Sequence, residues 1–575
     1  MIGTYSAVVA VCAASLAIGQ AAVLLCGGRR WSWLAPAVGL ALLCAVCWGT
    51  VRLPGHGVVS AVVVLALAVG AVGYLWGRVE GAGEALGIGW PVALGALLAA
   101  SLPFAVEGHF GILGTSFNPD MSQHLLTADR LAEGHSSQLL SQGYPLGPHS
   151  IVVALNKGLG VGLVQGFSGL TVAVAVLASL TALAAFAELG FVPRTAGALL
   201  AGLAYLIASY FAQGAFKETM QALFLLAFVL ALRESGRGWA DLPLRFVSAA
   251  LIAVGSVYVY SFPGLIWLGG AAVIWVAVEA RKGLPLRALG LALLAFFVLV
   301  APEIGRMVEF HSFETFDPNG PGLGNLFGQI SPFEVLGIWP SGDFRLAPGD
   351  GAVPAAAYYL GIAFGLVLFA YGVVWLWRRR ETAILAGLGA AAFAYVAARV
   401  GGTPYTSAKA LEIAAPLVAL TILLPLFTEA SAVRFTSAMR AKGAPLWATA
   451  ATAAFVVAAG ACSLLALANA PVGPTSYSST LSDYRKLVGE GPTLVVASPQ
   501  LLDEEHGGPY LSWELRGGRV CIQSTAETGK LPAGVRFVIR GGGEDWALTK
   551  VRRPPPGKSP CPLIAVRQAR QGPAR

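Results

Sequence analysis

The chain has 575 residues, of which 56% are hydrophobic and only 12% are charged. Soluble globular proteins carry about 25% charged residues, so this composition excludes a soluble protein and indicates a membrane protein. Glycine is abundant, with 71 residues, but it shows no three-residue period, which excludes collagen. The long apolar runs exclude a disordered chain.

Apolar segments of roughly 17–25 residues are long enough to cross a bilayer. The sequence contains about fourteen of them, near 4–26, 32–51, 57–76, 88–106, 166–188, 195–213, 218–232, 246–262, 264–280, 288–302, 353–376, 382–399, 410–427 and 445–468. We therefore expect an all-α polytopic membrane protein. The first segment has no cation before it and is followed by Arg29 and Arg30, which favours a first span over a cleaved signal peptide.

The 38 lysine and arginine residues fall into three groups along the chain. Alternate short loops between spans hold 16, the other inter-span loops hold 8, and 14 follow residue 470. Cations in short loops resist translocation, so we assign the first group to the cytoplasm. Both termini then lie outside the cell membrane. The net charge of +8 is explained by this topology and a basic tail, which argues against nucleic acid as a partner.

This topology divides the chain into two domains. Residues 1–469 form a transmembrane domain, whose loops 107–150 and 303–352 both face outwards. Residues 470–575 form an extracytoplasmic domain with a flexible basic end. Within it, three short runs are typical of buried strands and one is typical of a helix: 493–497, 518–522, 535–539 and 482–489. We therefore expect a small C-terminal α/β domain.

The seven cysteines divide in the same way. Five lie in or beside spans, where cysteine acts as a small apolar side chain. Cys521 and Cys561 are the two in the exported tail, where an oxidising compartment would allow a disulfide. The spacing of Cys and His residues does not indicate structural zinc.

The loop 107–150 holds the densest group of polar side chains in the membrane domain, including His109, His124, His135 and His149. Asn118-Pro119-Asp120 is typical of a helix start, with either Asn118 or Asp120 as the cap. In such a helix Asp120 and His124 share one face. They could share a proton, hold a metal ion or position a sugar hydroxyl. Alternatively, Asp120 only caps the helix and His124 is a solvated surface residue.

A second polar loop, 400–412, precedes the span at 410–427. Thr406 and Ser407 could cap that span, with Lys409 and Glu412 three residues apart in its first turn. A helix N-terminus beside a lysine suits phosphate. The alternative is a Lys409–Glu412 surface pair that anchors the end of the span.

Other charged residues at outer span ends are expected to be interfacial anchors rather than site residues: Lys217, Glu218, Glu303 and Arg306. The stretch 317–322 is turn-forming. No ionisable residue is expected near the middle of a span, which argues against an ion-coupled pump.

Taken together, these features resemble the GT-C superfamily of integral-membrane glycosyltransferases. The resemblance comprises many spans, a carboxylate in the first long external loop, a second large external loop and an exported C-terminal domain. The stretches 118–120, 143–149 and 404–411 are similar to actinobacterial-type membrane proteins of this architecture. The resemblance implies that Asp120 acts as a catalytic base or as a metal ligand.

The resemblance leads us to expect an inverting glycosyltransferase that moves a sugar from a polyprenyl-phosphate donor to a cell-envelope glycan or lipid-linked acceptor at the outer face. Asp120 would be catalytic, and the expected substrate-binding residues are His124, Tyr144, His149, Lys217, Arg399, Tyr405, Lys409 and Glu412. No cofactor is identified, although Asp120 and His124 could hold Mg²⁺ or Mn²⁺. The alternatives are a transporter or flippase for lipid-linked saccharides, and a noncatalytic scaffold for envelope assembly.

Overall fold

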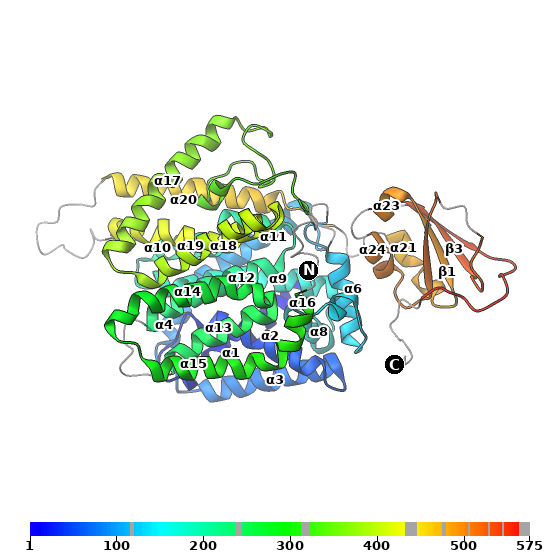
Figure 1. The fold of residues 1–575 in the computed structure, drawn as a ribbon, viewed down its shortest axis with the longest axis horizontal. Coiled ribbons are helices and arrows are strands. Elements are labelled where there is room, and N and C mark those ends of the chain that lie inside the picture. The colour runs from blue at the N-terminus through cyan, green and yellow to red at the C-terminus, as the bar shows by residue number, and fades with distance from the viewer. Residues whose placement is uncertain are drawn as a thin grey trace, which may run out of the picture.

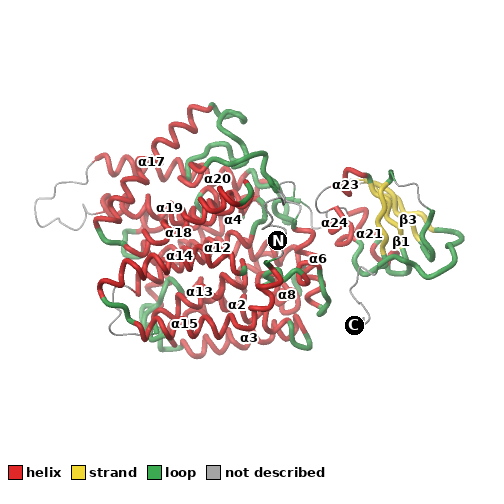
Figure 2. Tube along the Cα trace, in the orientation of Figure 1, coloured by secondary structure: helices red, strands yellow, loops and turns green. Residues whose placement is uncertain are grey.

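The computed structural model describes residues 1–115, 120–235, 244–311, 322–431, 446–473, 479–503, 507–526, 530–542 and 545–562. They form a large helical domain and a small C-terminal domain that contains the strands (Figure 1, Figure 2). Three features expected from the sequence lie outside the described residues: the helix start at Asn118 and Pro119, the turn at 317–321 and the basic end after residue 562.

The helical domain is built from long apolar helices with shorter helices at one end. The first part comprises α1 (Ile2–Leu25), α2 (Ala35–Val51), α3 (His56–Leu75), α4 (Ala82–Ala100) and α5 (Leu102–Glu107). The first long loop contains α6 (Met121–Ala132), α7 (Gln138–Ser141) and α8 (Gly147–Leu159). The middle part comprises α9 (Leu163–Phe186), α10 (Phe191–Gly202), α11 (Tyr205–Ala212), α12 (Phe216–Ser235), α13 (Arg245–Tyr260), α14 (Leu265–Glu279), α15 (Leu286–Val300) and α16 (Ile304–Phe310). The last part comprises α17 (Ala355–Arg378), α18 (Thr382–Gly401), α19 (Pro404–Ser431) and α20 (Leu446–Ala468).

Ten helices in the described residues are long and apolar enough to cross a membrane, or eleven if the bent pair α10 and α11 is one span. Three other expected spans coincide with helices that are too short or too polar to be counted among them. Helices α2 and α13 are apolar but short, and α12 carries Lys217, Glu218 and Arg233. The chain is therefore a multi-pass helical membrane protein, while the count of about fourteen spans stays a prediction.

The ends of several helices are tied together at one end of the bundle. Arg233 at the end of α12 pairs with Glu381 before α18, with 2.8 Å between Nε and Oε2. Near the end of α19, Glu429 accepts a hydrogen bond of 2.9 Å from the Trp375 indole of α17. At the other end, the Tyr5 hydroxyl donates to Ser101 over 2.9 Å. The N-terminus therefore lies at the end that holds the 107–150 loop and the C-terminal domain (Figure 1).

The C-terminal domain contains a four-stranded sheet in the order β2-β1-β3-β4. Its strands are β1 (Thr493–Ala497), β2 (Val520–Ser524), β3 (Phe537–Gly542) and β4 (Asp545–Lys550). Strand β1 is parallel to β2 and β3, and β4 is antiparallel to β3. Helices α23 (Pro499–Asp503) and α24 (Gly507–Glu514) connect β1 to β2. The parallel pairing with a helical connection is the expected α/β arrangement.

Two details of this domain differ from the sequence prediction. The helix expected over 482–489 is divided into two short helices, α21 (Ser479–Asp483) and α22 (Arg485–Val488). Strand β4 was not predicted. It is an edge strand in which Trp546 is the buried side chain and both ends are charged, so it lacks the apolar run of a buried strand.

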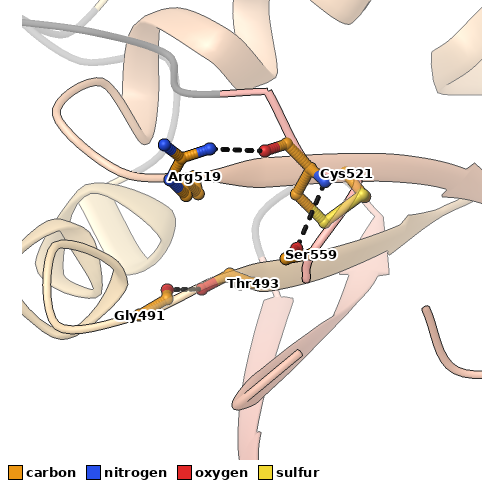
Figure 3. Close-up of a disulfide and its surroundings, with 6 residues drawn as sticks. Gly491, Thr493, Arg519, Cys521 and Ser559 are labelled. Atoms are coloured by element: carbon orange, nitrogen blue, oxygen red, sulfur yellow. Dashed lines mark hydrogen bonds between the residues drawn. A yellow bond between two sulfur atoms is a disulfide. The ribbon is translucent and has the colours of Figure 1, made fainter. Parts of the chain in front are cut away.

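A disulfide joins Cys521 in β2 to Cys561, 40 residues later (Figure 3). The Cys561 backbone N–H donates to the Ser559 hydroxyl at 3.2 Å, and Arg519 donates to the Cys561 carbonyl at 3.4 Å. The bond fixes the segment after β4 against the opposite edge strand of the sheet.

The C-terminal domain contacts the membrane domain along α6. Leu126 of α6 packs against the apolar core of the C-terminal domain, while Trp513 of α24 joins the core of the membrane domain. An ion pair joins Arg516 to Asp129 of α6, with 3.7 Å between Nε and Oδ1. Ile112 and Gly473 exchange backbone hydrogen bonds of 3.1 and 2.8 Å. Helix α6 is therefore shared by both domains.

We expect the double variant Cys521→Ser/Cys561→Ser to destabilise the C-terminal domain by about 3–4 kcal/mol, because a disulfide closing a loop of this length restricts the unfolded chain. Urea unfolding, monitored by hydrogen exchange of the β1 and β2 amides, measures the change in the free energy of unfolding. Cys26→Ala, which removes a buried free thiol from the membrane domain, serves as the control. An unchanged unfolding midpoint for the double variant would contradict the prediction.

Candidate functional site

Helix α6 begins at Asp120, whose backbone carbonyl accepts from Gln123 and His124 N–H groups at 3.0 and 3.1 Å. Asp120 is thus the N-cap residue by position, as the sequence predicts, but without the side-chain hydrogen bond of a capping carboxylate. The carboxylate is half-buried, and it acts electrostatically on Tyr144, Lys217 and Tyr405.

His124 lies one turn further along α6 and is buried, with 7% of its surface exposed. It is therefore not the solvated residue of the alternative interpretation. Its Nδ1 lies 3.1 Å from Nε2 of His149, which is fully buried near the start of α8. Burial lowers the pKa of His149 well below its usual value, and His124 and Lys217 lower it further. One neutral imidazole can donate to the other, whereas two imidazolium ions could not.

Tyr144 connects the first outer loop to α12. The Lys217 ammonium donates a hydrogen bond to the Tyr144 hydroxyl and lies 4.0 Å from the centre of its ring. Burial raises the pKa of Tyr144 well above its usual value, and the carboxylates of Glu218 and Asp120 add to this while Lys409 opposes it. Tyr144 therefore stays a neutral phenol that orients the Lys217 ammonium.

An ion pair joins α12 to α19 beside Lys217. Lys409 Nζ lies 2.9 Å from Oε1 of Glu218, and the two side chains are only 13% and 6% exposed. Lys409 also lies 4.1 Å from the centre of the Tyr405 ring. The alternative of a Lys409–Glu412 surface pair is thus wrong, as is the expectation that Glu218 is an interfacial anchor. Both charges of the actual pair are buried.

The start of α19 also differs from the prediction. The helix begins at Pro404, so Lys409 and Glu412 lie beyond its first turn. Thr403 takes the capping role, because its hydroxyl accepts from the Thr406 N–H at 3.2 Å while the Thr406 hydroxyl accepts from the Thr403 N–H at 2.9 Å. Ser407 instead donates to the Pro404 carbonyl at 2.8 Å. Proline at the first helical position suits this arrangement.

Glu412 lies one turn beyond Lys409 and is completely buried. Neither of its carboxylate oxygens has a hydrogen-bond partner among the described residues. Glu218 and Lys409 are its electrostatic neighbours. An isolated buried carboxylate is costly unless it is protonated or bound to a ligand, so Glu412 marks a polar position inside the bundle.

The second outer loop closes over the same residues. Asn325 donates a hydrogen bond to Gln213 after α11, and Gln329 donates to Ser407 at 2.8 Å. The Tyr405 N–H donates to the Gly322 carbonyl at 3.4 Å. Contacts from both long loops therefore converge where α6, α12 and α19 meet.

Arg306 of the second long loop is held by a buried salt bridge within that loop and reaches the first long loop through a hydrogen bond. Arg306 Nε lies 2.5 Å from Oε2 of Glu303, and the side chains are 9% and 2% exposed. Arg306 also donates to the Gly143 carbonyl at 2.9 Å. Gly143 has a positive φ of 67°, and a Cβ there would lie 2.4 Å from the Arg306 carbonyl oxygen. Only glycine allows this close approach, and the contact fixes Tyr144.

The structure brings most of the expected site residues into one cluster, called here the outer cluster: Asp120, His124, Tyr144, His149, Lys217, Tyr405, Lys409 and Glu412. Arg399 is different, because it lies exposed near the end of α18 and no contact joins it to the outer cluster among the described residues. Tyr210 and Tyr260 also border the cluster, since both interact electrostatically with Lys409 and Glu412. Both tyrosines lie near the ends of expected spans, and this position was the feature of the sequence that could have indicated them as site residues.

In the part of the chain that the structure describes, no group of three or more His, Cys, Asp or Glu side chains is placed to hold a metal ion. Asp120 and His124 thus do not form such a group with a third described ligand. We derive no chemical step through a metal.

No family model matches the chain, and no curated protein matches it significantly.

We expect Lys409→Met to lower stability by about 3 kcal/mol, because it leaves the buried Glu218 carboxylate without its closest cation. The double variant Glu218→Gln/Lys409→Met should recover much of this loss, since it removes both charges. Thermal unfolding of the purified protein in detergent measures both effects.

The exposed pair of Arg30 and Glu80, 3.8 Å apart with side chains 87% and 61% exposed, provides a matched control. Arg30→Met should change stability by less than about 1 kcal/mol. If Lys409→Met were as mild as Arg30→Met, the Glu218–Lys409 pair would not be a buried one.

Proposed function

We propose that the protein is a GT-C-type membrane glycosyltransferase that moves a sugar from a polyprenyl-phosphate donor to a cell-envelope acceptor at the outer face of the membrane. The observation that carries this proposal is the outer cluster. It combines a carboxylate that makes no capping hydrogen bond to its helix with two buried ammonium groups, at the point where both long loops meet. A base and a phosphate-binding cation are the two groups that such a transfer requires.

The proposed reaction is a direct displacement at the anomeric carbon. The acceptor hydroxyl oxygen forms the new bond to that carbon, and the bond to the donor phosphate oxygen breaks. Asp120 takes the hydroxyl proton, and the electron pair leaves with the lipid phosphate. Because the acceptor attacks opposite the leaving group, the anomeric configuration inverts. A positioned base of this kind contributes about 10²–10⁴ in rate.

Lys217 is the better candidate for the leaving phosphate. Lys409 pairs directly with Glu218 at 2.9 Å, whereas Lys217 donates its hydrogen bond to a neutral phenol and interacts with Glu218 and Asp120 through space. Its charge is therefore available to offset the charge that develops on the phosphate. Lys409 would keep Glu218 in place and contribute to the local potential. The lipid tail would lie between spans, and Tyr405 and the paired histidines would line the sugar.

One observation favours the alternative of a carrier for lipid-linked saccharides. Glu412 is a buried carboxylate without a hydrogen-bond partner among the described residues, and intramembrane carboxylates of this kind serve proton-coupled transporters. Its position beside the Glu218–Lys409 pair also suits hydrogen bonding to a substrate hydroxyl. Counterflow of a lipid-linked saccharide across proteoliposomes distinguishes the two functions.

We expect Asp120→Asn to lower sugar transfer from lipid-linked donors about 10²–10⁴-fold while the protein folds normally, because the amide cannot accept the proton. Transfer is measured in membranes that contain equal amounts of each protein. The matched control is Glu107→Gln, which changes an exposed carboxylate of the same loop and should leave the rate unaltered. Transfer at the wild-type rate by Asp120→Asn would remove Asp120 from the mechanism.

We expect Lys217→Met to lower the rate of transfer from polyprenyl-phosphate donors at least about 10²-fold, because the developing phosphate charge loses its cation. Arg399→Met is the control, since Arg399 is exposed and outside the outer cluster. Donor titrations at fixed acceptor measure both variants. Equal donor dependence for wild type and Lys217→Met would contradict the phosphate role.

A further inference from the structure

A separate pocket lies at the junction of the two domains. It has a volume of about 410 Å³ and is lined by residues of α6, α8, α9, the segment between α8 and α9 and the end of α24: Asp129, Ala132, Glu133, Asn156, Lys157, Gly162, Leu163, Val164, Gln165, Trp513 and Arg516. None of the outer cluster residues lines it. A cavity of this size is within the range of small-molecule sites.

The charges around this junction pocket are balanced. Lys157 Nζ lies 2.6 Å from Oε1 of Glu133, and Arg516 faces Asp129 at 3.7 Å. The second distance exceeds hydrogen-bonding range, so those two groups attract each other without a direct hydrogen bond. With two acids and two bases, the pocket offers no net charge to an anion or a cation. It offers hydrogen-bond donors and acceptors to a neutral ligand instead.

The remaining lining residues indicate the class of that ligand. Asn156 donates to the Val161 carbonyl at 2.8 Å, which leaves its carboxamide oxygen as an acceptor. Gln165 accepts from the Gly162 N–H at 3.1 Å, which leaves its carboxamide N–H groups as donors. Trp513 is only 4% exposed and the Arg516 guanidinium covers its ring at 3.6 Å from the centre, so the ring closes the pocket and is not a stacking face. Polar side chains that present both donors and acceptors match the hydroxyl groups of a sugar. A lipid tail would instead require a mainly apolar lining.

Helix α6 connects the junction pocket to the outer cluster. Asp120 precedes its first turn, whereas Asp129 and Glu133 lie in or just after its last turn. At 1.5 Å of rise per residue, Asp120 and Asp129 are separated by about 13 Å. The nine-residue interval also turns the two side chains to opposite faces of the helix, so the junction pocket and the outer cluster are separate sites.

We propose that the junction pocket binds a neutral saccharide chain, as a holding site for the part of the acceptor away from the reacting hydroxyl. The binding site is inferred from the lining residues alone, and its role for the acceptor rests on the proposed function. Because Trp513 and Arg516 come from the C-terminal domain, the site is complete only when that domain contacts α6.

Binding is tested with the full-length protein in detergent on a printed array of neutral and anionic bacterial oligosaccharides, without donor. We expect neutral oligosaccharides of several sugars to be retained. Arg516→Ala and Gln165→Ala, from opposite walls of the pocket, should each weaken retention at least about 10-fold, because each removes hydrogen bonds to a buried ligand. Arg536→Ala is the control, since it changes an exposed cation elsewhere in the C-terminal domain.

Gln165→Ala keeps the test informative if Arg516→Ala detaches the C-terminal domain. Binding without any transfer would remove the proposed function and leave the saccharide site standing. Retention of anionic oligosaccharides only, retention of none, or retention unaffected by both pocket variants would overturn the inference.

Discussion

The arrangement of the outer cluster depends on the buried ion pair between Glu218 and Lys409, because a charge removed from water requires a partner nearby. Consecutive residues of a helix point about 100° apart. With Glu218 directed to α19, the neighbouring Lys217 is directed to Tyr144 in the first outer loop. One pairing between two helices therefore determines which lysine is neutralised and which remains available to an anion.

The second constraint is the contact of Arg306 with both outer loops. Arg306 neutralises Glu303 and also donates to the Gly143 carbonyl, while the absence of a side chain at Gly143 lets α16 approach. The next residue is Tyr144, which contacts Lys217. Residues that resembled membrane anchors in the sequence thus position the phenol that orients the Lys217 ammonium. Their role is to hold the site, and they need not contact substrate.

The sequence was sufficient for the features that depend on local composition or spacing. Apolar runs located the long helices. The four-residue spacing of Asp120 and His124 predicted that both belong to the start of one helix, which is α6. Pairings between distant segments could not be predicted in this way. Lys409 had a carboxylate three residues away in Glu412, yet its partner is Glu218 of another helix. Arg399 was misplaced because α18 is apolar all round, so its sequence does not reveal which side faces the cluster.

Helix α6 then links the chemistry to the C-terminal domain. His124, Leu125 and Ala128 are buried against the membrane domain, whereas Leu126 packs on the C-terminal domain and Asp129 pairs with Arg516. A helix of 12 residues with both faces occupied cannot rotate without breaking one of the two contacts. Asp120 is the residue immediately before this helix, so the position of the carboxylate is set by the membrane domain and the C-terminal domain together. Through α6, the C-terminal domain therefore helps to fix the position of Asp120 in the outer cluster.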